Sequence, residues 1–213
     1  MNETLNSEIQ RTFTLPEENK DTMVREGPRY WKRLINKWER CGMDTINFVK
    51  SLSPTLVLDL GCGENQYKHY IPNLVGIDLV NELADIKSDI STIPYDDNVA
   101  DVVLCFGSIN FGDSKLIETQ LLEMYRVLKP GGYAVFRVNT DTNHDTRNIY
   151  YGWTPELANY WTEKLNLQYG QEPITIVRTN TNGQPNLNWV DKTNLKIGAT
   201  PRTPYRLFWI WKK

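Results

Sequence analysis

The sequence predicts an α/β fold in which a mostly parallel seven-stranded sheet has an antiparallel C-terminal edge and follows an N-terminal helical extension. Three observations lead to this prediction. Apolar runs of strand length alternate with stretches of helical spacing, the first such run ends in two glycines one residue apart, and the last two runs flank a hairpin signal. Such alternation is typical of parallel sheets, because parallel strands are joined by crossovers that usually contain a helix.

The composition fits one folded domain. The chain has 213 residues, of which 40% are hydrophobic and 11% aromatic, so it holds enough apolar material for a buried sheet. Its net charge of −2 at pH 7 lacks the positive field of an obligate nucleic-acid binder. No apolar run approaches the roughly 20 residues that cross a bilayer, and no secretory signal pattern is seen, so we expect a cytoplasmic protein without a membrane segment.

The three cysteines predict reduced thiols. Cys41, Cys62 and Cys105 are odd in number and widely separated, which argues against a disulfide framework and against a metal site.

The chain is predicted to open with a leader and a helical extension. Residues 1–25 are polar without a period and are expected to be loosely held, ahead of a single domain at 26–213 that opens with helices at 26–53. The apolar faces of these helices comprise Trp31, Leu34, Ile35 and Trp38 in the first and Ile46, Phe48, Val49 and Leu52 in the second. The first helix is also basic, which fits either an amphipathic cover or a lid that contacts an anionic group.

The first half of the predicted sheet contains four strands. Apolar runs at 55–60, 74–79 and 101–106 are typical of buried parallel strands, and a less apolar run at 84–89 is predicted as another. The link between the second and third runs is too short for a full helix, whereas a crossover normally takes a dozen residues or more.

The second half combines two helices with three strands. A helix predicted at 113–128 is ended by the Lys-Pro-Gly-Gly stretch before a strand at 133–138. After a polar loop, Thr154-Pro155 predicts the start of a helix. Strands at 174–179 and 206–211, with Asn182-Gly183 as a hairpin turn, complete the antiparallel edge.

The turn at Gly61 to Gly63 is the strongest candidate for a binding loop. Glycines let the backbone turn sharply and let a ligand approach without meeting a Cβ atom. Ligands of open parallel sheets bind beyond the carboxyl ends of the strands, where this turn is expected. A strand-to-helix turn without a ligand is the alternative explanation.

Asp78 ends the next strand, near the place where nucleotide-binding folds carry a ribose-binding acid. A carboxylate can accept hydrogen bonds from both hydroxyls of one ribose. A solvated aspartate at a strand end would explain Asp78 by itself, but its position after the glycine turn favours the ribose.

Four segments together resemble the class I S-adenosylmethionine-dependent methyltransferases, and within them the small members related to the ubiquinone-biosynthesis type. The segments are Leu58 to Asn65, Gly76 to Leu79, Asp89 to Val103 and Glu123 to Gly132. Their joint order is more specific than any one of them. The resemblance implies a Rossmann-like fold, S-adenosyl-L-methionine as cofactor, a cofactor-binding half at 55–139 and a substrate side at 140–213.

The resemblance also implies a contact for each part of the cofactor. Asp59 would orient the loop and reach the amino group, and Asp78 would hold the ribose. Asp89 and the Ile90 backbone would meet the adenine edge, and the residues after the fourth strand would line the methyl side. The implied cofactor-binding residues are Asp59, Gly61, Cys62, Gly63, Asp78, Leu79, Asp89, Ile90, Phe106, Gly107 and Ser108.

This chain departs from the family at Asn65, where many relatives have a third glycine. Asparagine tolerates left-handed backbone angles better than most residues, so we expect the turn to survive. The missing crossover helix after Asp78 is a second departure, which leaves the adenine side more open.

The methyl acceptor is less constrained than the cofactor. Methyl transfer needs alignment more than covalent help, because the sulfonium is already reactive. His144, in the polar loop after the 133–138 strand, is the candidate general base, with a solvated loop residue as the alternative. His69 is expected at the surface or in packing.

A small-molecule acceptor is expected, and RNA or protein acceptors stay open. DNA is a weak candidate, because the Asn/Asp-Pro-Pro-Tyr sequence of amino-directed DNA methyltransferases is missing after the fourth strand. Two other functions stay open. One is cofactor binding without turnover, and the other is an NAD-dependent oxidoreductase, which the lack of a full Gly-x-Gly-x-x-Gly opposes.

Overall fold

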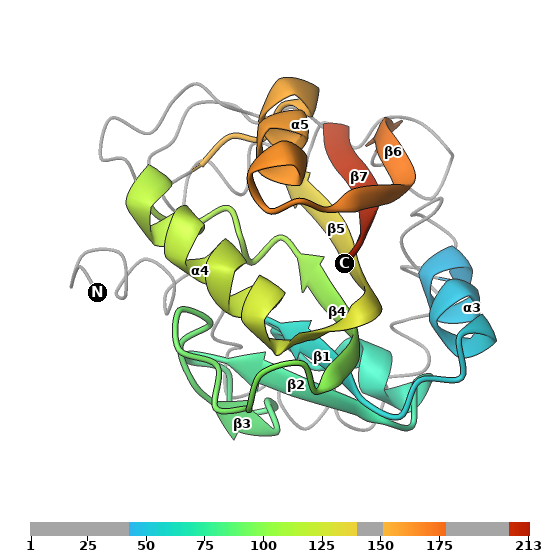
Figure 1. Ribbon diagram of the computed structural model, residues 1–213. Helices are drawn as coiled ribbons and strands as arrows, with labels where there is room; N and C mark the ends of the chain where they lie inside the picture. The colour runs from blue at the N-terminus through green and yellow to red at the C-terminus, as the bar shows by residue number, and fades with distance from the viewer. Residues whose placement is uncertain (1–42, 140–150, 178–204) are drawn as a thin grey trace.

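Seven strands form one sheet in the computed structural model of the protein, which describes residues 43–139, 151–177 and 205–213 (Figure 1). The strands are β1 (Val57–Leu60), β2 (Leu74–Asp78), β3 (Ile86–Lys87), β4 (Ala100–Phe106), β5 (Leu128–Asn139), β6 (Gln168–Val177) and β7 (Tyr205–Lys212). The helices are α3 (Met43–Ser51), the 3-10 helix η1 (Gln66–His69), α4 (Ser114–Val127) and α5 (Pro155–Lys164). The predicted leader and first helix lie outside the described residues.

The strand order β3-β2-β1-β4-β5-β7-β6 confirms the predicted fold class. Strands β3, β2, β1, β4 and β5 pair in parallel, while β7 is antiparallel to both β5 and β6. The antiparallel C-terminal part is therefore present, with the reversed strand β7 second from the edge because β6 lies outside it. The predicted hairpin turn at Asn182-Gly183 lies outside the described residues.

Alternating residues of the strands separate two apolar layers. Leu104 and Val135 face a layer that includes residues of α3 and η1, whereas Cys105 and Phe136 face a layer with α4 and α5. Figure 1 accordingly shows α4 and α5 over one face of the sheet and α3 on the other side. Because both faces are covered, the strands read as near-continuous apolar runs.

The two helix starts read from the sequence agree with the structure. Asp113 caps α4 by accepting the Leu116 N–H at 2.9 Å, and Thr154 caps α5 by accepting the Leu157 N–H at 3.2 Å. Each side chain replaces one of the backbone acceptors that the first helical turn lacks.

Three strands differ clearly in length from the prediction, and one of them, β5, begins at Leu128 instead of 133. The run at 84–89 forms only the two residues of β3, paired with Ile77 and Asp78 of β2. In contrast, β6 starts at Gln168 instead of 174, because pairing with β7 extends it through register irregularities. Partner strands decide strand length here, since the polar composition of 168–173 does not favour a strand.

Candidate functional site

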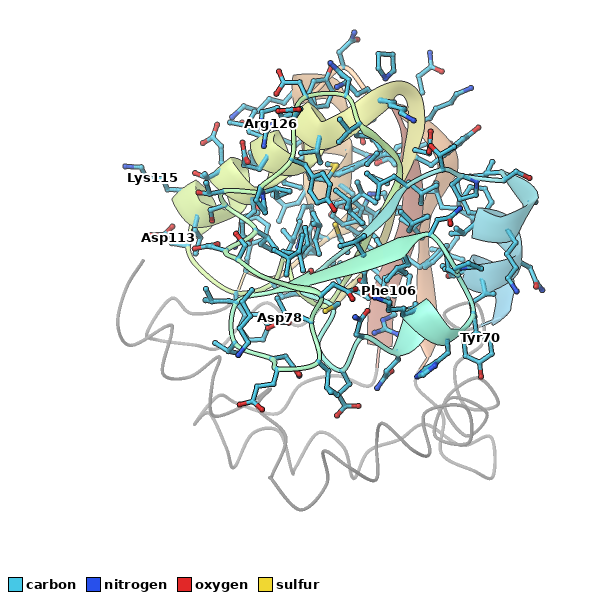
Figure 2. The ribbon with its side chains drawn as sticks, turned by 90° about the horizontal axis from the view of Figure 1, so that it is seen from below. Tyr70, Asp78, Phe106, Asp113, Lys115 and Arg126 are labelled. Carbon is cyan, nitrogen blue, oxygen red and sulfur yellow. The ribbon has the colours of Figure 1, made fainter. Side chains whose placement is uncertain are left out.

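The carboxyl ends of β1, β2 and β4 meet at one edge of the sheet and carry most of the predicted site residues. Asp78 ends β2 and Phe106 ends β4, and Figure 2 labels both near this edge. The Gly61 and Cys62 N–H groups donate to the Ile77 carbonyl at 2.7 and 3.1 Å, which joins the glycine turn to β2. The first two matched segments of the sequence are thus brought together.

The glycines of the turn are required for two different reasons. Gly61 and Gly63 both have left-handed φ angles, of 69° and 53°. A Cβ atom at Gly61 would stand 2.2 Å from the Cβ of Ser108, so packing against the loop after β4 excludes any side chain there. A Cβ atom at Gly63 would meet no atom of the described residues within 4 Å. Gly63 therefore faces open space at the edge where ligands bind such sheets.

Asp78 ties this turn to the end of β2. Its Oδ2 atom accepts the Gly63 N–H at 3.0 Å, and its Oδ1 atom accepts the N–H groups of Val80 and Asn81 at 2.9 and 3.0 Å. Asp78 is only 7% exposed. Because each carboxylate oxygen can accept about two hydrogen bonds, Oδ2 keeps capacity for a further donor such as a hydroxyl.

The Asn65 side chain makes hydrogen bonds that a glycine could not make. It adopts the left-handed conformation with φ 51°, as expected. Its Nδ2 atom donates at 3.0 Å both to the Leu83 carbonyl and to Asp85 Oδ2, and Asp85 also accepts the Gly76 N–H and pairs with Lys68. Side chains therefore hold the loop that replaces the missing crossover helix.

Asp59 is the most buried acid of the site. It lies within β1 and is 2% exposed. Burial raises the pKa of its carboxyl to about 7, with the nearby charge of Arg137 lowering the pKa and that of Asp78 raising it. Asp59 is thus held close to its protonation point at neutral pH.

The loop after β4 closes the other side of the glycine turn. Gly107 has φ 82°, and a Cβ atom there, as at Gly63, would have no atom of the part of the chain that the structure describes within 4 Å. The Ser108 hydroxyl oxygen is buried without a hydrogen-bond partner among the described residues. Phe106 contacts the Tyr67 ring with centroids 5.1 Å apart, and the Arg137 guanidinium lies 4.9 Å from the Phe106 centroid.

The predicted adenine-side residues follow β3. The Ser88 N–H donates to the Asp78 carbonyl at 3.0 Å, which brings Asp89 beside the end of β2. The Asp89 carboxylate accepts the Ser91 N–H at 2.9 Å, and Ile90 is buried in the layer under α4. The Ser91 hydroxyl oxygen is buried without a hydrogen-bond partner among the described residues. Leu79, directly after Asp78, is half-buried.

The two histidines and the two described cysteines complete the residues that the sequence analysis singled out. His69 is exposed on η1, and His144 lies outside the described residues. Burial raises the pKa of both the Cys62 and the Cys105 thiol, so both stay protonated and neither is an activated nucleophile. No helix in the described part of the chain is long and apolar enough to cross a membrane.

Arg126, within the fourth matched segment, lies away from the site and clamps two matched segments to each other. Its guanidinium donates to the carbonyls of Ile93 and Tyr95, and to the carboxylates of Asp97 and Glu123, at 2.7 to 2.9 Å. Figure 2 shows Arg126 on α4, far from Asp78 and Phe106. Part of the sequence pattern that resembles the methyltransferase family is therefore structural.

Two residues near the site were missed in the sequence. Ser91 directly follows the predicted Asp89 and Ile90, and this position in the sequence was the signal that could have identified it. Arg137 interrupts the otherwise apolar 133–138 run one residue before its end, and a charge in a buried strand is an available sequence signal.

Comparisons with known proteins agree with this geometry. Residues 58–136 match the family model described as a methyltransferase domain. No curated protein sequence matches the chain. Three solved structures have similar folds at low identity.

The first is the 1,6-didemethyltoxoflavin-N1-methyltransferase of Burkholderia thailandensis, with bound 1,6-didemethyltoxoflavin and S-adenosylhomocysteine: 14% identity, TM-score 0.57, covering 100% of this chain and 91% of that one. The second is a SAM-dependent methyltransferase of Thermotoga maritima, titled a possible histamine N-methyltransferase: 17% identity, TM-score 0.55, covering 91% and 97%. The third is the [4+2]-cyclase SpnF: 14% identity, TM-score 0.56, covering 75% and 74%. At these identities the likeness establishes the fold.

Proposed function

We propose that this chain, whose residues 58–136 match a methyltransferase-domain model, transfers a methyl group from S-adenosyl-L-methionine to a small-molecule acceptor. The observation that carries the proposal is the open space in front of Gly63 and Gly107, two left-handed glycines on different loops at the carboxyl edge of the sheet. In both places a side chain would stand where a ligand approaches.

The residues around this space fit the cofactor. The Asp78 carboxylate keeps capacity for a ribose hydroxyl. The buried hydroxyls of Ser91 and Ser108 have no hydrogen-bond partner among the described residues, and a polar ligand would supply one. The Asp78 carboxylate gives the edge an acidic group, which suits a ligand with a sulfonium and an ammonium group. Asp89 and the Ile90 backbone stand beyond them, where we propose the adenine edge.

The chemistry asks mainly for alignment. When bound, S-adenosyl-L-methionine supplies an activated methyl group on its sulfonium. Phe106, Gly107 and Ser108 would then form the wall beside that methyl group, and the loops would hold an acceptor behind it. His144 is the proposed general base, on the basis of its loop position after the predicted fifth strand.

The small-molecule acceptor is supported by neighbours of the same fold. The Burkholderia thailandensis structure holds a small heterocyclic acceptor, and the Thermotoga maritima protein is titled a possible histamine N-methyltransferase. The cytoplasm stays the proposed location, since Cys62 and Cys105 are unpaired thiols that fit a reducing compartment.

A second candidate is binding of the cofactor for another purpose. It is favoured by the likeness to the [4+2]-cyclase, which shows that this fold is not limited to proteins titled methyltransferases.

Two measurements test the proposal. First, thermal unfolding with S-adenosylhomocysteine or NAD should show stabilisation by the former alone. A larger shift with NAD would contradict the assignment. Second, incubation with methyl-labelled cofactor and fractionated cell extract should label a low-molecular-mass fraction. Tight S-adenosylhomocysteine binding without label in any fraction would support the second candidate.

A further inference from the structure

Arg137 is a charged residue at the end of an apolar strand. It belongs to β5, where it lies in register with a residue of each neighbouring strand: Phe106, the last residue of β4, and Phe208 of β7. Strand alternation places it on the same face as Val135, toward η1 and α3. Its guanidinium lies over the Phe106 ring at 4.9 Å, so it is held at the site edge of the sheet.

Asp59 faces the same side of the sheet from β1. It lies in register with Leu104 of β4, and Leu104 lies in register with Val135. Arg137 is two residues further along β5, toward the glycine turn, and its positive charge acts on the Asp59 carboxyl. One acid and one cation therefore face the same side of the sheet below Gly61 to Gly63, on strands that flank β4.

We propose that Arg137 binds the α-carboxylate of S-adenosylmethionine, next to the α-ammonium group that the family resemblance assigns to Asp59. This inference rests on the proposed function and adds to it the residue that recognises the amino-acid end of the cofactor. That end is a zwitterion, so it needs one cation and one anion spaced as neighbours. A guanidinium fits a carboxylate with two parallel hydrogen bonds, and the Phe106 ring beneath it limits the planes that it can adopt.

The same charges have a structural explanation, in which Arg137 only neutralises Asp59. The two explanations differ in what they predict for ligands that lack the carboxylate. Decarboxylated S-adenosylmethionine lacks this group alone, and 5′-methylthioadenosine lacks the whole amino-acid part. If Arg137 binds the carboxylate, only ligands that carry it should respond to substitution.

Calorimetric titration of the full chain with these three ligands tests the proposal. For Arg137→Gln we expect an affinity for S-adenosylmethionine about 10- to 100-fold lower, and changes of less than about threefold for the other two. Arg137→Lys should fall between, because it keeps the charge but loses the planar fork. Lys212→Gln is the matched control, since Lys212 is also a cation over an aromatic ring of this sheet, 5.7 Å from the Tyr133 centroid. It should bind all three ligands like the unsubstituted chain.

Several outcomes would overturn the proposal. Equal losses for all three ligands would make Arg137 a residue that only supports the site. Unchanged affinity for S-adenosylmethionine would remove Arg137 from the site. Circular dichroism of each variant separates these results from misfolding, and Arg137→Lys serves as the readout if Arg137→Gln does not fold. If the unsubstituted chain binds none of the three, the proposed function itself fails, and the inference fails with it.

Discussion

Two aspartates on neighbouring strands of the sheet have opposite environments. Asp101, near the start of β4, accepts hydrogen bonds from the N–H and hydroxyl of Thr55, the N–H of Leu56 and the ammonium of Lys129, at 2.6 to 2.9 Å. Burial opposes ionisation, but these donors outweigh it and lower the pKa of Asp101. Asp59 on β1 is buried, and burial raises its pKa to about 7.

The difference between the two aspartates indicates which end of the sheet contributes mainly to stability. At the amino end, every oxygen of Asp101 has a donor, and Arg126 and Lys213 are bonded in the same thorough way. The Lys213 ammonium donates to Asn98 Oδ1 and to the carbonyls of Tyr125, in the last turn of α4, and of Leu128, just after that helix, at 2.7 to 2.8 Å. At the carboxyl end, the chain keeps an acid with a raised pKa and buried hydroxyls that have no partner in the described ranges, and such costs to stability are common at binding sites.

The largest expected effect is a dependence of stability on the ionisation of Asp59. Its pKa is raised from 3.8 to about 7 in the folded chain, so the folded state binds the proton more tightly. The resulting stabilisation is complete below pH 3.8 and is lost as the pH rises to about 7. We expect Asp59 to contribute a loss of up to about 4 kcal/mol in the free energy of unfolding across this window.

Urea unfolding at pH 5 and pH 8 measures this effect. The stability difference between the two pH values should shrink in Asp59→Asn, because the titrating carboxyl is gone. Asp101→Asn is the control: its lowered pKa keeps Asp101 ionised at both pH values, so the pH difference should stay that of the unsubstituted chain. Parallel curves for all three proteins would show that Asp59 titrates normally.

The next effect tests Arg126 as a clamp away from the site. Arg126→Ala removes hydrogen bonds to two carbonyls and two carboxylates, so we expect a loss of roughly 2–3 kcal/mol in the free energy of unfolding. The folded protein should bind S-adenosylhomocysteine with unchanged affinity by calorimetry. A loss of affinity without a loss of stability would place Arg126 in the site.

A smaller effect is expected for Asp101→Asn. An amide can replace only part of the four hydrogen bonds and removes the charge opposite Lys129, so we expect a loss of about 1–2 kcal/mol at pH 7. Denaturant unfolding gives the stability, and titration with S-adenosylhomocysteine should show no change. Weaker binding would mean that the two ends of the sheet are coupled.

The smallest stability effect separates the glycines of the two ends. Gly63 and Gly131 have φ angles of 53° and 79°, and at either position a Cβ atom would meet none of the described atoms within 4 Å. We therefore expect Gly63→Ala and Gly131→Ala to destabilise the chain equally, by roughly 1–2 kcal/mol. Only Gly63→Ala should weaken S-adenosylhomocysteine binding, by about tenfold or more. Equal binding by both variants would place the ligand away from Gly63.

Most of the fold could be read from the sequence where the local signal and the packing agree. The buried parallel strands at β1, β2 and β4 have continuous apolar runs, and α4 and α5 have side-chain caps at Asp113 and Thr154. The prediction was poorest at β3 and β6. Their residues are polar or mixed, so partner strands determine where pairing begins and ends.

In the candidate site, too, some residues have a local sequence signal and others are brought together only by the fold. The glycine turn and Asp78 have local signals, and the structure joins them through the Gly63 N–H. Arg137 is more than seventy positions away from Asp59 in the sequence, and no spacing rule connects the two.

The sequence alone therefore determined the fold class, the glycine turn and the acid that follows it, because each depends on backbone geometry or periodicity within a few residues. Tertiary structure decided which charges share an environment. Asp59 and Asp101 are the same residue type on adjacent strands, and only packing buries the first within the charge influence of Arg137 and surrounds the second with donors. The physical reason is that solvation and Coulomb interactions depend on distance in space, which a linear pattern does not contain.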